Sequence, residues 1–258
     1  NPTKSWEEQW AKPYGTNNES GPLYKVPWLA VHGNHDLGDD DQYGLCPGKK
    51  TGAHVIDGQP YAALQFNADR NPERPASTAH YWFPDYNYHY HIPELSLELI
   101  AVDRNINDLN GLGGNAGGHA QAFKTCGGQE AVQEFLTKVD SAGDRLLADR
   151  AANGTATSAV VIQHYPGHCG RSTFNANLAE GRNVQLLCAY GHTHNQHCDH
   201  ANGPNGTCSD VLTGGGGGCC APEVNLAGFT AVTLDEMGGF SVDVSSPDVR
   251  MHSNQCQW

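Results

Sequence analysis

Short apolar runs recur along the chain, and each one stops where the sequence turns polar. A continuous apolar run of about 4–8 residues bounded by turn signals is typical of a strand buried on both faces. We predict three such strands that end at loops carrying Asn or His, over residues 27–31, 159–162 and 184–189. A fourth run, residues 95–102, first alternates, then becomes wholly apolar and ends at Asp103.

The clearest helical period lies in residues 129–152, where apolar residues repeat on one face and Asn153 begins a stop signal. A second, short helix is expected from Ser5 to Lys12, because Ser5 fits a capping position. Pro13 is expected to end that helix.

The C-terminal part of the chain has the pattern of short strands. Residues 229–234 and 240–244 alternate on either side of a Gly-containing turn, which predicts a hairpin. Residues 210–213 form a further short strand, whereas residues 38–80 and 104–128 are polar or Gly-rich and are expected to be long loops.

Strands interleaved with a helix predict a layered α/β fold, in which ligands bind beyond the ends of strands. The chain has 258 residues, of which 38% are hydrophobic, so it can bury a sizeable core. Because it shows neither a repeat nor a linker, we expect a single domain over residues 1–258.

The net charge of the chain limits the kinds of ligand and macromolecule that it can bind. There are 15 Lys and Arg residues against 28 Asp and Glu residues, a net charge of −13, which argues against nucleic-acid binding. The same charge repels anionic substrates unless bound cations reverse the field locally. Protonating all 14 His residues would add 14 charges and move −13 to +1, so the surface should change sharply in mildly acidic water.

The number of cysteines and the glycosylation sequons indicate the cellular compartment in which the protein is expected to function. The chain has nine Cys residues and three Asn-x-Ser/Thr sequons in polar stretches, at Asn18, Asn153 and Asn205. Together they favour a secreted glycoprotein in an oxidising environment. No run of about 18 apolar residues is present, so no membrane span is expected.

One disulfide is predicted, between Cys198 and Cys208, because the Gly- and Pro-containing segment between them can turn back on itself. The alternative is a zinc-type cluster of Cys198 with His197 and His200. The odd number of Cys residues leaves one thiol free or paired outside the chain.

Polar motifs stand at the ends of the three predicted strands. Neutral imidazoles and an amide oxygen suit borderline metals such as zinc, iron and manganese. Alternate residues of an extended segment point the same way, so the two His side chains of the last motif can converge on one ion or on two adjacent ions. In chain order the motifs are Gly33-Asn34-His35-Asp36, Val161-Ile162-Gln163-His164 and Gly191-His192-Thr193-His194.

GNHD, VxxH and GHxH in this order resemble the calcineurin-like metallophosphoesterases. Within that family, three further features are similar to the small, tartrate-resistant type of purple acid phosphatase: Pro27-Trp28, His164-Tyr165-Pro166 and Gly228-Phe229. The resemblance implies a four-layer αββα sandwich, with two sheets face to face between helices.

The resemblance also implies roles for individual residues. Asn34, His164 and His192 would bind one metal ion of a pair, and His194 would bind the other. His35 would lie beside the substrate and stabilise the phosphoryl group or protonate the leaving oxygen. The pair would be divalent or trivalent ions of Fe, Zn or Mn, which activate a hydroxide to hydrolyse phosphate monoesters, best at acidic pH.

The chain departs from the family in one respect. The family places two acidic motifs, DxG and GDxxY, before GNH, and no Asp precedes Gly33 here. Either the chain is the larger, C-terminal part of a protein whose N-terminal segment supplies these motifs and the first strands, or it is a degenerate relative. By itself it is expected to hold at most one metal ion, weakly, and to be inactive. The alternative function is a non-catalytic extracellular structural or binding glycoprotein.

Overall fold

The computed structural model describes residues 11–16, 18–21, 23–24, 26–37, 66, 80–107, 129–167, 169–178, 183–193, 196–199, 208–213 and 229–245. These residues belong to two compact units. The first unit comprises residues 1–86 and 108–138, and the second comprises residues 87–107 and 139–258. Helix α5 (Gln129–Asn153) contributes residues to both.

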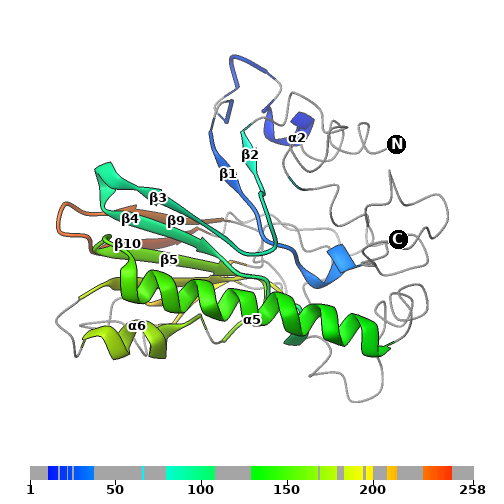
Figure 1. Cartoon of the computed structure of the whole chain (residues 1–258). Coiled ribbons are helices and arrows are strands. Elements are labelled where there is room, and N and C mark those ends of the chain that lie inside the picture. Colours follow the sequence, from blue (N-terminus) through cyan, green and yellow to red (C-terminus); the bar gives the residue numbers. More distant parts are fainter. Residues whose placement is uncertain are drawn as a thin grey trace. The chain divides into compact units, whose positions relative to one another are not determined.

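A six-stranded mixed sheet organises the second unit (Figure 1). Strands β4, β5, β6 and β8 run parallel, and β3 and β7 are antiparallel to their neighbours at the two edges. Because parallel strands end at one edge of a sheet, the segments that follow β4, β5 and β6 meet there. The strands, in sheet order, are β3 (Tyr88–Ile92), β4 (Leu97–Ala101), β5 (Ser158–Gln163), β6 (Gln185–Tyr190), β8 (Asp210–Thr213) and β7 (Gln196–Asp199).

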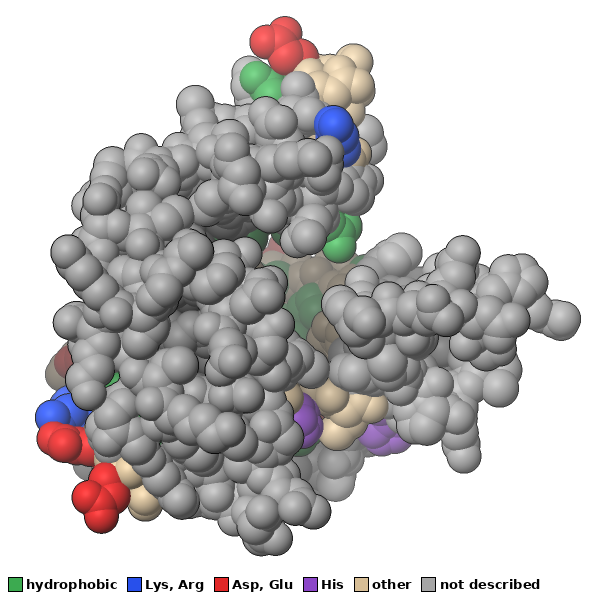
Figure 2. Space-filling view, turned by 90° about the vertical axis from the view of Figure 1, so that its right-hand side faces the viewer, with side chains coloured by type: hydrophobic (Ala, Val, Ile, Leu, Met, Phe, Trp, Pro, Cys, Tyr) green, Lys and Arg blue, Asp and Glu red, His purple; other side chains and the backbone are tan. Residues whose placement is uncertain are grey.

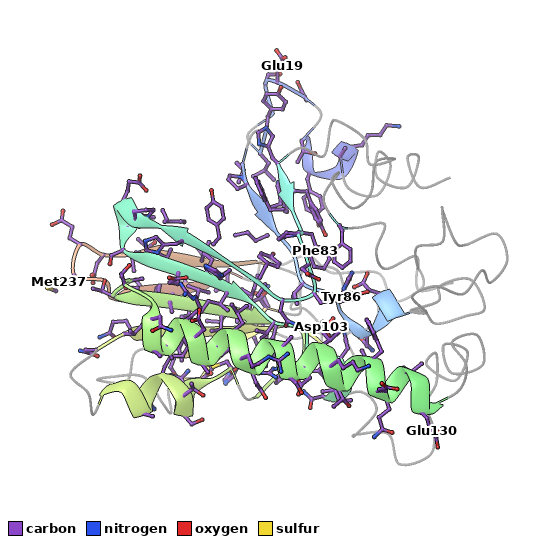
Figure 3. The ribbon with its side chains drawn as sticks, viewed as in Figure 1. Glu19, Phe83, Tyr86, Asp103, Glu130 and Met237 are labelled. Atoms are coloured by element: carbon purple, nitrogen blue, oxygen red, sulfur yellow. A yellow bond between two sulfur atoms is a disulfide. The ribbon has the colours of Figure 1, made fainter. Side chains whose placement is uncertain are left out.

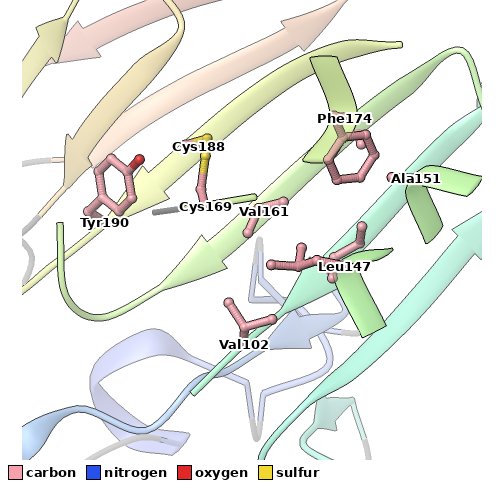
Figure 4. Close-up of a cluster of buried hydrophobic side chains, with 10 residues drawn as sticks. Val102, Leu147, Ala151, Val161, Cys169, Phe174, Cys188 and Tyr190 are labelled. Carbon is pink, nitrogen blue, oxygen red and sulfur yellow. A yellow bond between two sulfur atoms is a disulfide. The ribbon is translucent and has the colours of Figure 1, made fainter. Parts of the chain in front are cut away.

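Two helices contribute side chains to the core on one face of this sheet. Leu147 and Ala151 of α5, with Phe174 of α6 (Arg171–Leu178), pack in one buried cluster with side chains of the central strands (Figure 4). Burying one such aliphatic or aromatic side chain stabilises the fold by roughly 1.5–3 kcal/mol. The strand residues of this cluster are Ile100, Ala159, Val161, Cys188 and Tyr190, and Val102 joins it directly after the end of β4.

The opposite face of the sheet meets a hairpin formed by β9 (Phe229–Leu234) and β10 (Phe240–Ser245). Side chains alternate along a strand, so Ser158 of β5 points away from Ala159 and its helix-side neighbours. The Ser158 hydroxyl donates to the carbonyl of Gly238 at 2.8 Å. Gly238 has a left-handed backbone (φ 81°), as a tight hairpin turn requires, and Met237 beside it is exposed at the tip (Figure 3).

A buried arginine ties the segment after β4 to α5. The Arg104 guanidinium donates to Asp140 at 2.7 Å and to Asp144 at 2.8 Å, both on the helix. Burial opposes its charge, but hydrogen bonds and attraction from the two carboxylates outweigh burial and raise the pKa of Arg104. The guanidinium therefore stays charged and holds the helix beside the end of β4.

The first unit contains a two-stranded parallel sheet of β1 (Trp28–Leu29) and β2 (Tyr81–Trp82). Beyond β1, the imidazole of His32 is fully buried among aromatic rings, 4.4 Å from the ring of Phe83 and 5.2 Å from that of Tyr86, centre to centre. Figure 3 labels these two aromatic residues. The cluster holds the chain directly before the GNHD motif.

Most predicted elements are present in the described residues. The helix of residues 129–152, the strands predicted within residues 95–102, 159–162 and 184–189, the strand of residues 210–213 and the hairpin are confirmed. The run over residues 27–31 is half-buried or exposed rather than buried, and only two of its residues form a strand. Helix α6 and strand β7 were not expected. The predicted loops of residues 38–80 and 104–128 lie almost entirely outside the described residues.

The prediction that Pro13 ends a helix is wrong. The described helix α2 (Lys12–Tyr14) runs through Pro13 and ends at Gly15, whose backbone is left-handed (φ 65°). Proline is tolerated in a first helical turn, because the amide hydrogens there have no partner within the helix. Residues 5–10 of the expected helix lie outside the described residues.

Two short 3-10 helices complete the described elements, η2 (Asn34–Leu37) in the first unit and η6 (Pro93–Leu95) in the second. The architecture is a mixed α/β fold with one large sheet and few helices. The single-domain organisation stays a prediction. Among the described helices, none has both the length and the apolar composition needed to cross a bilayer.

Candidate metal centre

Two predicted ligands lie together at the ends of adjacent parallel strands. His164 directly follows the last residue of β5, and His192 is the second residue after the end of β6. The last residues of these two strands, Gln163 and Tyr190, are register partners. His164 Nε2 lies 3.3 Å from His192 Nδ1, and both residues are half-buried. Their rings stand nearly perpendicular, 77° apart, so the two nitrogens face each other rather than stacking.

This separation fits two ligands of one ion. Imidazole nitrogens bind zinc at about 2.0–2.1 Å, so two of them lie about 3.3–3.4 Å apart at a tetrahedral angle and about 2.8–3.0 Å apart at an octahedral one. The observed 3.3 Å falls within the tetrahedral range. His164 and His192 are only half-buried, and Figure 2 shows histidine side chains at the surface on one face of the molecule. The residues therefore fit the metal that the motifs predict.

The turn that carries His192 depends on Gly191. The Gly191 amide donates to the His164 carbonyl at 3.0 Å, and a Cβ atom at Gly191 would lie 3.2 Å from His164 Nδ1. The absence of a side chain thus lets the two histidine loops approach. His192 has a left-handed backbone (φ 65°), which is uncommon for any residue other than Gly and is often found in turns and at functional sites.

Buried polar and aromatic contacts support the His164 loop. The side-chain amide of Gln163 is buried and donates to the carbonyl of Tyr165 at 2.7 Å, and also to that of Gly167. The Tyr165 ring lies 4.3 Å from the His192 ring, centre to centre. These contacts hold the loop in the conformation that presents His164 to His192.

The GNHD motif forms a closed turn in the first unit. The Gly33 amide donates to the Asp36 carboxylate at 2.7 Å, and the Asp36 amide donates back to the Gly33 carbonyl at 3.2 Å. Asp36 therefore has a structural part in the turn that presents Asn34. Because Asn34 belongs to the other unit, its convergence with His164 and His192 stays a prediction. The His35 side chain and the whole of His194 lie outside the described residues.

The structure contains the predicted disulfide between Cys198 and Cys208, with a Cα–Cα distance of 5.6 Å. It also contains an unpredicted one between Cys169 and Cys188, with a Cα–Cα distance of 6.0 Å. The possible ligand atoms of Cys169, Cys188 and Asp210 lie within 4.8 Å of one another, the one such group among the described residues. Joined in a disulfide, the two sulfurs are not thiolates, so this group is not a metal site in the oxidised protein.

Two of the three sequons are described, and both asparagines are exposed. The Asn18 side-chain oxygen accepts from the hydroxyl of Ser20 at 2.8 Å, so the two functional groups of this sequon are in contact. Asn153 ends α5, and its side-chain amide donates to Asp149 at 2.8 Å. Asn205 lies outside the described residues.

A family model for the calcineurin-like phosphoesterases matches residues 2–196, which include all three motifs. The chain belongs to the calcineurin-like phosphoesterase family. No curated protein and no solved structure matches the chain significantly. Membership indicates metal-dependent hydrolysis of a phosphate ester, and the α/β architecture described above fits the family. The match is to the family as a whole, so the likeness to purple acid phosphatases stays a prediction.

Proposed function

We propose that this calcineurin-like phosphoesterase is a secreted, glycosylated phosphatase of the acid phosphatase type, acting on phosphate monoesters. The observation that carries the metal-dependent part is the 3.3 Å separation of His164 Nε2 and His192 Nδ1 at the ends of two adjacent parallel strands. The acid phosphatase type rests on the likeness of the motifs to that group.

Asn34, His164 and His192 would hold one metal ion, and His194 would contribute to a second. When bound, such ions polarise a phosphoester, activate water and offset the charge of a chain with a net charge of −13. His164 and His192 must be neutral to act as ligands, and Gly191 and Gln163 hold them in place. His35 would hold a proton for the leaving oxygen, and Asp36 closes the turn that positions it.

Secretion is supported by two disulfides and by the exposed sequon asparagines Asn18 and Asn153. Peptide mass spectrometry of protein from its source cells should find glycans at Asn18, Asn153 and Asn205. Three unmodified peptides would remove the main support for an extracellular location.

The metal-binding part is tested by titrating the metal-free chain with Co²⁺ and following the ligand-field absorption. His164→Ala and His192→Ala should each weaken binding by more than about 100-fold, because each removes a direct ligand. His89→Ala is the matched control, since His89 is an exposed histidine on the edge strand β3, and it should bind as the wild type does.

The catalytic part is tested with protein expressed from the full coding sequence, by hydrolysis of p-nitrophenyl phosphate at acidic pH. The two ligand variants should lose activity in parallel with metal affinity, and the His89→Ala control should retain it. If the wild-type protein binds metal but hydrolyses no phosphate monoester, the function is the alternative one, a non-catalytic extracellular glycoprotein. If it binds no metal, the proposed centre itself is wrong.

A further inference from the structure

Three polar side chains meet beside the His192 turn, outside the proposed metal centre. The Tyr190 hydroxyl donates to Asp210 Oδ1 at 2.9 Å, and Arg171 Nη2 donates to the same oxygen at 3.0 Å. The other carboxylate oxygen, Oδ2, accepts from the Ser209 hydroxyl at 2.9 Å. One carboxylate thus receives three hydrogen bonds, one of them from a cation, and such charge-assisted bonds are the stronger kind.

The partners of Asp210 come from the two segments that carry the proposed ligands. Tyr190 is the last residue of β6, and it directly precedes Gly191-His192. Figure 4 labels the Tyr190 side chain and that of Cys188, which lies two residues earlier in the same strand. Arg171 is the first residue of α6 and follows the loop that begins at His164. Asp210, on β8, therefore joins the end of the His164 loop to the start of the His192 turn.

A covalent link runs between the same two segments. The Cys169–Cys188 disulfide joins the residue two before Arg171 to the residue two before Tyr190. Arg171 Nη2 also lies 3.3 Å from Cys188 Sγ and 3.0 Å from the carbonyl of Ser209. The disulfide limits how far the segments separate, and the hydrogen bonds to Asp210 set the orientation of their ends.

The His192 turn needs such support. His192 holds a left-handed backbone, and a strained conformation of this kind persists only where surrounding contacts over-determine it. The buried Tyr190 ring packs in the core, and its hydroxyl bond to Asp210 anchors the chain two residues before His192. Loss of that anchor would let the turn relax and change the spacing of the two imidazoles.

We propose that Asp210 is a positioning residue for the metal centre, which it serves by holding Tyr190 and Arg171. It keeps His164 and His192 at the spacing of one ion through these two partners. The inference rests on the proposed function, because it assumes that these histidines bind metal. It adds a residue that lies outside all three sequence motifs.

The variants Asp210→Ala and Tyr190→Phe test this role with the whole 258-residue chain. Tyr190→Phe removes one hydroxyl and leaves the ring in the core, while Asp210→Ala removes the shared acceptor. Asp210, Tyr190 and Arg171 border a cavity of about 1140 Å³, so water can replace the lost partner and the variants should fold. Asp243→Ala is the charge control, because Asp243 is an exposed acid on β10.

The readouts are the Co²⁺ dissociation constant and the ligand-field spectrum of the bound ion, measured beside thermal stability. Both variants should bind Co²⁺ about 10-fold more weakly, with shifted bands, as is typical when a residue that orients a ligand is lost. The control should match the wild type. Ile100→Val, which disturbs the same core but not Asp210, should lower the melting temperature and leave the Co²⁺ spectrum unchanged.

Wild-type affinity and an unchanged spectrum in both variants would overturn the positioning role and leave the proposed metal centre standing. Equal spectral changes in Ile100→Val would show that the effect is general loss of stability, which also overturns it. Failure of the wild-type chain to bind Co²⁺ would instead contradict the proposed function. If Asp210→Ala does not fold, Tyr190→Phe alone decides the outcome.

Discussion

At the scale of single residues, the proposed metal centre depends on the missing side chain of Gly191 as well as on the two histidine ligands. The Gly191 backbone occupies the space beside His164 Nδ1, so the ring presents its other nitrogen to His192. A histidine ligand commonly has its second nitrogen held by a neighbouring group, which sets the ring orientation. Here, close packing against a glycine contributes to that orientation.

Gly191→Ala should therefore weaken metal binding more than it weakens the fold. The new Cβ would stand 3.2 Å from His164 Nδ1, so the ring must shift by a few tenths of an ångström. We expect Co²⁺ affinity to fall about 10-fold, while the free energy of unfolding changes by about 1 kcal/mol or less. Calorimetric titration and urea denaturation measure the two effects.

Thr193→Ala is the control for that substitution, because Thr193 is exposed and its contact with Gly191 runs through the backbone amide. It should leave affinity unchanged. Equal affinity in Gly191→Ala and the wild type would show that the position of His164 does not depend on the glycine.

Asp210 also predicts a pH dependence of stability. Burial raises its pKa, but hydrogen bonds from Ser209 and Tyr190, together with the charge of Arg171, outweigh burial and hold the pKa below its ordinary value of 3.8. The pKa of Asp210 is thus lower in the folded state than in the unfolded state. The ionised carboxylate therefore stabilises the fold fully above the unfolded pKa, and this contribution is lost as the pH falls through the folded pKa.

The free energy of unfolding of Asp210→Asn should therefore lie below that of the wild type by a constant amount from pH 7 to about pH 5. The difference should shrink below about pH 4. Urea denaturation across this range measures it. A difference that persists unchanged into strong acid would mean that Asp210 contributes through shape rather than through charge.

At the scale of elements, the strands with a strong apolar pattern could be predicted, and those that depend on a partner could not. Helix α6 contains few apolar residues, of which Phe174 is buried, so its sequence has no clear helical stripe. The polar strand β7 forms because it pairs with β8, and the Cys198–Cys208 disulfide lies beside that pairing. Tertiary pairing of this kind leaves little trace in a local pattern.

The same distinction holds for the site. The motifs placed His164 and His192 at strand ends, and parallel pairing of β5 with β6 brings them together. The Cys169–Cys188 disulfide and the contacts of Asp210 depend on which strands are neighbours in the sheet. A sequence alone does not state the order of strands in a sheet. The pairing of Cys169 with Cys188 and the supporting role of Asp210 therefore could not be predicted from the sequence.

The two disulfides should differ in their effect on the centre. Closing loops of 19 and 10 residues contributes roughly 3 kcal/mol each in the chain-entropy account, slightly more for the longer loop. Replacing Cys169 and Cys188 by Ala should lower stability by about that amount and also weaken Co²⁺ binding, because this disulfide joins the two ligand-bearing segments.

Replacing Cys198 and Cys208 by Ala is the matched comparison, and it should lower stability similarly while leaving Co²⁺ affinity closer to that of the wild type. Denaturant unfolding and metal titration of the two double variants provide the comparison. Equal losses of affinity would show that the centre responds to stability alone.

At the scale of the whole molecule, charge decides how many ions the chain can hold. Histidines and one amide carry no charge to offset a pair of divalent cations. Two such ions about 4 Å apart repel strongly, by roughly four times the single-charge value of ~4 kcal/mol at an effective dielectric constant of 20. In the family, the DxG and GDxxY motifs supply the acidic ligands that reduce this repulsion.

The 258-residue chain should therefore bind one metal ion at most and should not turn over p-nitrophenyl phosphate. A chain extended by an N-terminal portion that carries both acidic motifs should bind two ions and hydrolyse the ester. Metal analysis and a hydrolysis assay on the two proteins, side by side, check this. Two tightly bound ions in the 258-residue chain would show that the ligands are misassigned.

The most direct test of the centre is the identity of the atoms around one bound zinc ion, measured by X-ray absorption spectroscopy on the 258-residue chain. The account predicts a shell of nitrogen and oxygen atoms at about 2.0–2.1 Å, with the scattering pattern of two or more imidazoles, which His164→Ala and His192→Ala diminish. A sulfur shell at about 2.3 Å would contradict it, because it would place the metal at cysteine thiolates instead of at the two histidines.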